Sequence, residues 1–209
     1  MWNDLNVPWQ EAFALAWESY KKKTIPIGAV IVDENQKIIA RGRNRIFDLE
    51  SSNWLAGTNM AHAEMTAMVQ LKEGEHPNIR DYTLYTTMEP CPMCVGTILM
   101  MHICKLEYAA KDGFAGAIAL KDKLEYTKKK TLQIGRTAKH AEIFQIALIT
   151  AFESQREPRK KELILDSWRV DCPEGVKLGE ELFTEKYFEE AAEKNVDVSV
   201  VYDFVRHRF

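Results

Sequence analysis

Two short motifs in the first half of the chain contain the side chains of a hydrolytic metal site. An HxE motif occupies residues 62–64, and a PCxxC motif occupies residues 90–94. His62, Cys91 and Cys94 supply three ligands, which leaves the fourth position of a tetrahedral zinc ion open for water, as in catalytic zinc sites. Glu64 remains as a carboxylate that can take up and return a proton. We therefore predict a catalytic metal centre with Glu64 as its acid/base.

The spacing of the ligands agrees with this chemistry. Cys91 and Cys94 are three positions apart, so both sulfurs lie on one side of the first turn of a helix, where free N–H groups favour thiolates. His62 precedes apolar residues at helical spacing, which places it near another helix start. Two thiolates balance a divalent cation, and these soft ligands favour zinc over magnesium or calcium, although iron fits the same ligands.

Other uses of these residues were compared with the catalytic one. A CxxC pair without an HxE motif is typical of redox proteins and of structural zinc ribbons. His102 and Cys104 follow the Cys91 helix and would complete a four-ligand structural site, but such a site leaves Glu64 without a function. We expect His102 and Cys104 to pack in a turn and a strand.

The pattern of apolar residues predicts alternating strands and helices. The expected order is a helix over 8–22, strands over 27–32 and 37–42, a polar loop over 45–61, a helix from His62, a strand over 82–87, a helix from Cys91 and a strand over 105–109. Each connection between a strand and a helix must cover a face of the sheet. The predicted fold class is α/β, a three-layer α/β/α sandwich with a central mixed sheet and a C-terminal elaboration.

The 209 residues suit one domain with additions. We expect a core that contains the zinc site over 1–120, an insertion containing a helix over 121–166, and a C-terminal strand and helix over 167–209 that complete the same domain. Within the last part, Trp168 to Cys172 is the expected strand and 176–194 the expected helix. Residues 196–209 fit either a strand or a tail exchanged in a dimer.

The net charge of −3 is unevenly distributed, with −3 over 1–110, +5 over 111–165 and −5 over 166–209. The basic block contains lysines 128–130 and a second run over 159–161. We interpret it as a solvated loop, with nucleic-acid binding as the alternative. The sequence has no apolar run long enough to cross a membrane and no signal-like N-terminal region, so we expect a cytoplasmic protein without a membrane partner.

Residues from about 25 to 116 resemble the cytidine-deaminase-like superfamily of zinc-dependent deaminases, most closely its branch of guanine deaminases and tRNA adenosine deaminases. The resemblance is carried by residues 26–30, Asn44, residues 61–64 and residues 88–94, and the HxE and PCxxC pair is the signature of zinc nucleobase deaminases. It implies zinc bound by the three predicted ligands, proton transfer by Glu64, a hydrogen bond from Asn44 to the substrate base, and a homodimer.

Further substrate contacts are expected at Gly28, Ala29, Ala63 and Trp54. Gly28 and Ala29 leave room for a planar ring, or else pack as ordinary strand residues under a helix. The alternative for Asn44 is a turn residue at a strand end. Seventeen residues separate Asn44 from His62, a longer loop than in tRNA-editing relatives, and Trp54 in this loop either stacks on a base or anchors the loop to the core.

The predicted reaction is hydrolytic deamination of a small molecule. The exocyclic amine of a nucleobase, a nucleoside or a related amino-heterocycle is replaced by a carbonyl, and ammonia is released. Adenosine-to-inosine conversion in tRNA is the alternative within enzymes, favoured by the branch resemblance and the basic block. A zinc-stabilised, non-catalytic binding or scaffold protein is the alternative from another class.

Overall fold

The computed structural model describes residues 1–49, 53–72, 74–156 and 161–209. Its strands are β1 (Gly28–Val32), β2 (Ile38–Arg43), β3 (Thr83–Met88), β4 (Lys105–Ala110) and β5 (Gln133–Arg136). Its helices are α1 (Val7–Lys21), α2 (Ala63–Met68), α3 (Pro92–Met100), α4 (Glu125–Lys128), α5 (Lys139–Arg156), α6 (Lys161–Asp171), α7 (Pro173–Thr184), α8 (Tyr187–Glu193) and α9 (Val198–Arg206). Short 3-10 helices lie at η1 (Trp2–Asp4), η2 (Ile79–Asp81) and η3 (Ile118–Asp122).

The five strands form one mixed sheet in the order β2-β1-β3-β4-β5. β1 pairs antiparallel with both β2 and β3, whereas β3, β4 and β5 are parallel. Parallel neighbours require crossover connections, and α3 supplies the one between β3 and β4. Consequently the segments that follow β2 and β3 leave the sheet at the same end of the strands, where Arg43, Gly28 and Met88 lie.

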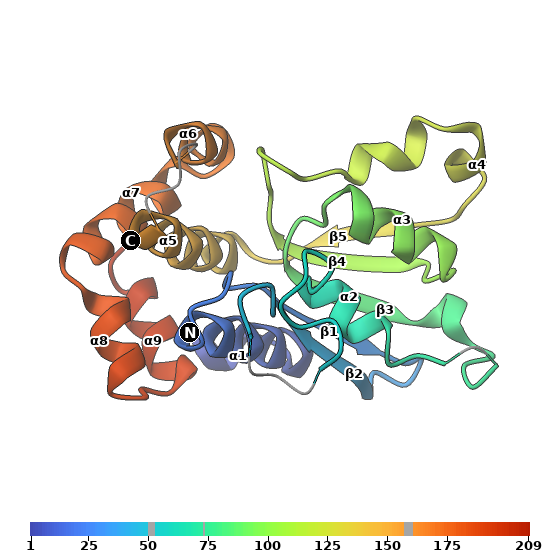
Figure 1. Cartoon of the computed structure of the whole chain (residues 1–209), viewed down its shortest axis with the longest axis horizontal. Helices are drawn as coiled ribbons and strands as arrows, with labels where there is room; N and C mark the ends of the chain where they lie inside the picture. Colours follow the sequence, from blue (N-terminus) through green and yellow to red (C-terminus); the bar gives the residue numbers. More distant parts are fainter. Residues whose placement is uncertain (50–52, 73, 157–160) are drawn as a thin grey trace.

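Alternating side chains of the strands enter two separate hydrophobic cores. Val30 and Tyr85 belong to the core shared with α1 and α5. Ile31 and Leu84, their neighbours along the strands, belong to the core shared with α2 and α3. Because successive side chains of a strand point to opposite faces, these memberships place one helix pair on each face of the sheet. The predicted three-layer α/β/α sandwich is confirmed (Figure 1).

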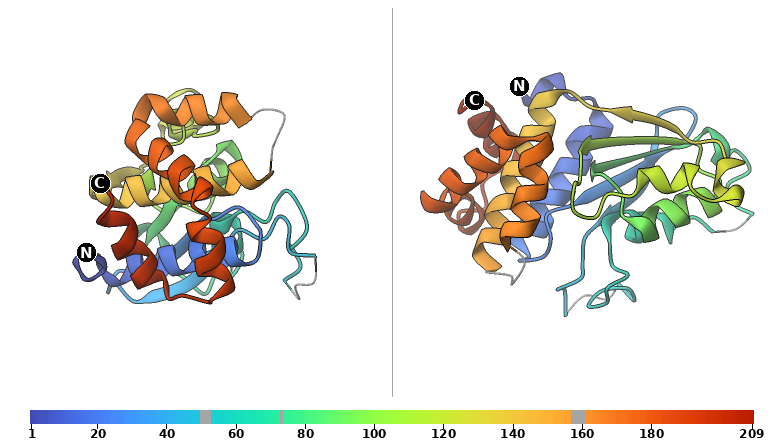
Figure 2. Two further views of the ribbon diagram at one scale, coloured as in Figure 1. Left: turned by 90° about the vertical axis from the view of Figure 1, so that its left-hand side faces the viewer. Right: turned by 90° about the horizontal axis from the view of Figure 1, so that it is seen from above.

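In the described residues from Lys139 onward, the regular secondary structure consists of helices α5 to α9, with short connections between them. Helices α6 to α9 gather at the end of the molecule that also holds both termini, whereas α4 lies at the other end (Figures 1 and 2). α5 links the two regions, since it covers the sheet on one side and packs against α7 on the other. The C-terminal helices therefore enlarge the core that α1 and α5 form on one face of the sheet.

The expected strand from Trp168 to Cys172 is wrong. Trp168 lies in α6 and Cys172 precedes α7 as its N-cap. The alternating apolar residues suggested a strand, but Val170 is 81% exposed while Leu165 and Trp168 are buried. Burial thus follows the three-residue spacing of a helix and not the two-residue spacing of a strand.

The rest of the C-terminal segment also differs from expectation. The single helix expected over 176–194 is divided into α7 and α8 at Lys186, which has a positive φ of 56°. Residues 198–206 form helix α9, capped by Asp197, and not a strand; exchange of this tail in a dimer stays a prediction. Tyr202 of α9 packs against Phe144 of α5, with ring centroids 4.7 Å apart, so this tail completes the core of its own chain.

The segment expected as an insertion over 121–166 contains a strand of the sheet. β5 pairs in parallel with β4 over Lys105 to Tyr108, in addition to the expected helix, which is α5. The division of the chain at 120 and 166 stays a prediction. Of the two basic runs, the first, lysines 128–130, lies at the C-terminal end of α4. Residues 159 and 160 of the second run, like residues 50–52 of the polar loop, lie outside the described residues.

Among the described residues, no helix combines the length and apolar character that crossing a bilayer requires.

Gly42 of β2 is required for the close packing of α2. A Cβ atom at this position would lie 2.1 Å from the Ala63 carbonyl oxygen and 2.5 Å from the Ala67 nitrogen. We expect Gly42→Ala to displace α2, lower the free energy of unfolding by about 1–3 kcal/mol and weaken zinc binding. Chemical denaturation and metal analysis measure both effects.

The matched control is Gly96→Ala in α3, where no atom lies within 4 Å of the added Cβ. There alanine should leave zinc binding unchanged and stabilise the helix by roughly 0.5–1 kcal/mol. If Gly42→Ala and Gly96→Ala change the free energy of unfolding and zinc binding to the same extent, the packing argument is contradicted.

Candidate metal centre and active site

Two helix starts bring the three predicted ligands together. His62 is the N-cap residue of α2, and Cys91 is the N-cap residue of α3. Cys94 lies in the first turn of α3 and is fully buried. Pro92 at the first position of α3 favours helix initiation there, because its fixed φ suits the helix and its missing N–H is not needed. The ligands therefore sit where backbone N–H groups and helix dipoles favour anions.

The spacing of the ligand atoms fits a tetrahedral zinc ion. His62 Nδ1 lies 3.5 Å from Cys91 Sγ and 3.7 Å from Cys94 Sγ, and the two sulfurs are 3.7 Å apart. Zinc bonds of about 2.3 Å to sulfur and about 2.0 Å to nitrogen, at tetrahedral angles, require separations of roughly 3.8 Å between the two sulfurs and roughly 3.5 Å between sulfur and nitrogen. In the described part of the chain, this is the group of three or more such side chains that can hold a metal.

Cys91 and Cys94 differ in their tendency to lose a proton. The hydrogen bond shared with Cys94, together with the one to His62, lowers the pKa of Cys91 to about 4 against the opposing effect of burial. The same shared hydrogen bond and burial raise the pKa of Cys94. Cys91 is thus the first thiolate, and a cation bound between the sulfurs would favour the second.

Glu64 lies beside the ligands without being one of them. Its carboxyl group is 3% exposed; Oε1 accepts a hydrogen bond from Thr86 Oγ1 at 3.0 Å, and Oε2 lies 3.5 Å from Cys94 Sγ. Burial raises the pKa of Glu64, and the neighbouring His62 opposes this rise. A raised pKa suits a group that must accept a proton and return it. Thr86 was not predicted from the sequence, because nothing in a strand of small polar residues marks it.

Asn44 is buried at the end of β2 and has structural partners. Its side-chain oxygen accepts hydrogen bonds from Thr24 Oγ1 at 2.8 Å and from the Ile46 nitrogen at 3.1 Å. Its carbonyl accepts from Ser19 Oγ at 3.1 Å. These hydrogen bonds are typical of a turn residue at a strand end. That role was the alternative to binding a substrate base. Its contact with a substrate stays a prediction.

Gly28, Ala29 and Ala63 are packed against other elements. A Cβ on Gly28 would lie 2.0 Å from the Ala12 carbonyl oxygen, so the close approach at this glycine is made by α1. Ala29 and Ala63 are fully buried. The packing alternative explains the residue types at 28 and 29, and a contact between a substrate and these three residues stays a prediction.

The polar loop after β2 begins and ends next to His62. The Arg45 nitrogen donates to the Ala61 carbonyl at 2.8 Å, which brings the two ends of the loop together. Leu55 is 2% exposed and anchors the loop, whereas Trp54 is 72% exposed. The alternative in which Trp54 anchors the loop to the core is therefore wrong, and its ring is accessible for stacking. A contact between Trp54 and a substrate stays a prediction.

Glu89 and Asp112 connect the metal-bearing segment to the C-terminal helices, and the sequence reasoning missed them. Glu89 accepts hydrogen bonds from the backbone nitrogens of Asp112 and Ile118, each at 3.3 Å. Asp112 Oδ1 in turn accepts from Trp168 Nε1 of α6 at 2.9 Å. Glu89 lies immediately before the PCxxC motif, two residues before Cys91, and this position is the signal that could have identified it.

The Trp168 bond allows a direct test of this connection. Trp168→Phe removes one donor from the Asp112 carboxylate, so we expect a loss of about 1.5–3 kcal/mol in the free energy of unfolding. Because the loop after β4 is then less firmly held against the segment before Cys91, kcat/KM should fall about tenfold.

Trp17→Phe is the matched control, because the Trp17 indole donates to the Val196 carbonyl at the same distance of 2.9 Å, away from the metal ligands. It should lose stability without losing activity in the same steady-state assay. If both variants keep full activity once folded, α6 does not support the site.

His102 and Cys104 do not join the predicted ligands. Cys104 Sγ donates to the His102 carbonyl at 3.4 Å, and both residues lie beyond the C-terminal end of α3, whereas Cys91 lies at its N-terminal end. The alternative of a four-ligand structural site at these residues is therefore wrong for the described structure.

Comparison with known proteins agrees with this site. The family model of the cytidine and deoxycytidylate deaminase zinc-binding region matches residues 5–110. A tRNA-specific adenosine deaminase of Haemophilus influenzae is 35% identical over 161 residues, which cover 74% of this chain and 86% of that protein. A tRNA(Ile)-lysidine synthase of Deinococcus radiodurans is 36% identical over 109 residues, but this chain spans 18% of its length.

Among solved structures, one from a study of A-to-I editing by tRNA:A34 deaminases covers 61% of this chain and 95% of its own, with 27% sequence identity and a TM-score of 0.52. Residues 5–110, which the family model matches, include both motifs, and the geometry of the three ligands fits zinc. This chain therefore belongs to the cytidine and deoxycytidylate deaminase family of zinc-dependent hydrolytic deaminases.

Proposed function

We propose that this protein converts adenosine to inosine in transfer RNA. The observation that carries the proposal is the 35% identity to the Haemophilus influenzae tRNA-specific adenosine deaminase over 161 residues. That similarity is longer than the zinc-binding region, which ends at residue 110. It therefore includes more than the metal motif that all deaminases of the family share.

The reaction replaces the exocyclic amine of adenine with an oxygen from water and releases ammonia. Bound zinc would supply a water molecule of lowered pKa beside His62, Cys91 and Cys94. Glu64 has the burial and the raised pKa to accept a proton there and to deliver it to the ring nitrogen and the departing amine. Thr86 fixes the orientation of the Glu64 carboxylate through Oε1, which leaves Oε2 on the side of Cys94.

The loop between Asn44 and His62 supports an RNA substrate. Chemistry on a base requires the base to leave its stack, and exposed aromatic rings replace part of the lost stacking. Trp54 is 72% exposed in a loop whose two ends meet beside His62. We infer that Trp54 stacks on a nucleotide next to the one that enters the site. Assembly as a homodimer, implied by the family resemblance, stays a prediction.

The second candidate is the small amino-heterocycle predicted from the sequence, which includes a guanine-like base. It is favoured by the charge of residues 166–209, which is −5 and opposes binding of a polyanion by the C-terminal helices. In that case these helices would shield a small substrate and would not contact RNA.

One assay separates the candidates. The zinc-loaded protein is incubated with total tRNA, and separately with adenosine, adenine, guanine, cytidine and cytosine; inosine is measured by mass spectrometry of digested RNA and ammonia by a coupled assay. Inosine in tRNA without turnover of free bases supports the proposal. Ammonia from a free base or nucleoside, with tRNA unchanged, supports the second candidate. Ammonia from none of them would favour the non-catalytic alternative.

A further inference from the structure

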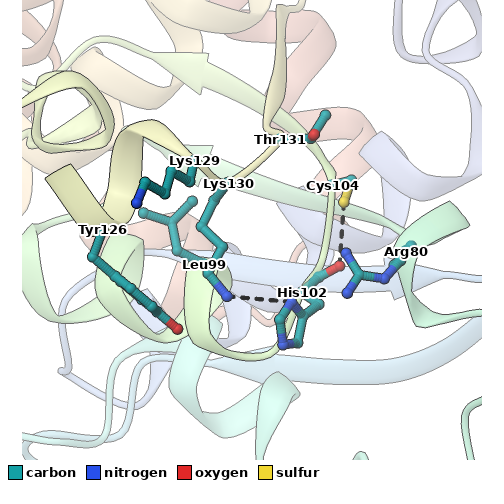
Figure 3. Close-up of a pocket in the computed structure, with 8 residues that line it drawn as sticks. All are labelled: Arg80, Leu99, His102, Cys104, Tyr126, Lys129, Lys130 and Thr131. Atoms are coloured by element: carbon teal, nitrogen blue, oxygen red, sulfur yellow. Dashed lines mark hydrogen bonds between the residues drawn. The ribbon is translucent and has the colours of Figure 1, made fainter.

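A basic cavity lies at the other end of the strands from the metal ligands. It has a volume of about 290 Å³ and is lined by Arg80, His102, Tyr126, Lys129 and Lys130, among others (Figure 3). Arg80 belongs to η2 before β3, His102 to the turn before β4, and the other three to α4 and the connection to β5. Three separate segments of the chain thus bring basic groups to one cavity.

Among the described residues, no carboxylate balances Arg80, Lys129 or Lys130 in this cavity. No acidic residue is among the described residues that line it. Lys130 Nζ lies 3.4 Å from His102 Nδ1 and 4.7 Å from the centre of the Tyr126 ring, so its described partners are uncharged or basic. Lys128, just outside, pairs with Glu125 at 2.9 Å, whereas no ion pair of Arg80, Lys129 or Lys130 occurs among the described residues.

The end of helix α3 explains only part of this arrangement. The carbonyl end of a helix favours one nearby cation, and α3 ends at Met100, next to His102. Arg80, Lys129 and Lys130 bring three further positive charges to the lining of the same cavity, and like charges repel one another. An anion in the cavity would relieve this repulsion, and a guanidinium with two ammonium groups is a set of donors that suits phosphate.

The position of the cavity suits a long ligand. Arg80 lies before the first residue of β3, and Cys91 lies after its last, so a six-residue strand of roughly 17–20 Å separates the two sites. A free nucleotide in the metal site cannot reach so far, but an RNA chain can contact both. Tyr126, which is 54% exposed at the rim, offers a ring to a base or ribose beside the bound phosphate.

We propose that the cavity at Arg80, His102, Lys129 and Lys130 binds a backbone phosphate of the RNA substrate, several nucleotides away from the base that enters the metal site. This assignment rests on the proposed function, because it requires an RNA substrate. The bound phosphate positions the RNA and takes no part in the reaction.

The test uses a double variant and a control with the same change in charge. Arg80→Gln combined with Lys129→Gln removes two cations from the cavity. Lys177→Gln combined with Lys194→Gln removes two from α7 and α8, where each lysine is at least 67% exposed and far from α4 (Figure 1). The dissociation constant of the full-length, zinc-loaded protein for tRNA is measured as a function of salt concentration.

The cavity variant should bind tRNA about tenfold more weakly at low salt, and the slope of log K against log salt should decrease by about 1. Inosine formation at saturating tRNA should be unchanged, since no group at the metal centre is altered. If the cavity variant binds tRNA like the control, the proposal is overturned. Binding of inorganic phosphate is measured by NMR. If the cavity variant loses phosphate binding but binds tRNA as the wild type does, the proposal is also overturned.

This experiment separates the cavity from the proposed function. If the wild-type protein binds tRNA with the expected dependence on Arg80 and Lys129 but forms no inosine, the phosphate site stands and the proposed reaction fails. If inosine forms and the cavity variant behaves like the control, the reaction stands and the phosphate site fails.

Discussion

Glu64→Gln is expected to reduce ammonia release by at least about 10³-fold while zinc remains bound, because positioned acid/base groups contribute about 10²–10⁴-fold to such reactions. The glutamine amide keeps the shape of the side chain, and its oxygen can still accept the hydrogen bond that Thr86 donates at 3.0 Å. It cannot take up a proton. Steady-state ammonia release and zinc content by atomic absorption measure the two quantities.

A buried carboxyl group elsewhere in the chain provides the control. Glu153 in α5 is 7% exposed, and burial raises its pKa as it does that of Glu64. Glu153→Gln should leave the rate unchanged, so a rate loss in both variants would point to a general effect of removing buried carboxyl groups. Retention of full activity by Glu64→Gln would remove Glu64 from the mechanism.

Cys94→Ser should abolish stable zinc binding. Cys94 is fully buried with its sulfur 3.7 Å from both other ligand atoms, and a serine hydroxyl at neutral pH is neither anionic nor soft. We expect zinc affinity to fall at least about 100-fold and, with zinc bound to the folded state alone, the stabilisation by metal to fall by about 2.7 kcal/mol or more. Competition with a chromophoric chelator gives the affinity, and thermal unfolding with and without chelator gives the stabilisation.

Cys104→Ser is the matched control, since Cys104 is also a free cysteine and its sulfur donates to a backbone carbonyl. That variant should keep its zinc and should respond to chelators as the wild type does. If Cys104→Ser loses zinc and Cys94→Ser keeps it, the assignment of the ligands is incorrect.

The core of the fold was predictable because each of its signals is local. Strands β1 to β4 and helix α1 lie within one residue of their predicted bounds, and helices α2 and α3 begin one residue after their predicted starts. Short apolar runs and helical spacing depend on near neighbours in the chain, so they can be recognised locally. The metal ligands were predictable for a related reason. Two of them lie within one helical turn, and all three have side chains that few other sites use together.

The C-terminal helices and β5 were not predictable in the same way. The residues of β5 are mostly exposed, so they lack the apolar alternation that marks a strand, and only pairing with β4 makes them one. At the end of α6, Trp168 and Val170 alternate with the following Cys172 as in a strand, yet packing against α7 and the loop after β4 selects the helix. Tertiary contacts override weak local preferences.

Three ligands and one spare carboxylate at fixed spacing specify a hydrolytic zinc site, so the chemistry of this protein follows from its amino-acid sequence alone. How that site is supported and extended depends on the tertiary structure. It brings Thr86 to Glu64 and Trp168 to Asp112, and it collects Arg80 and Lys129 from distant segments into one cavity. These contacts join residues far apart in sequence, and no local pattern encodes which of them meet.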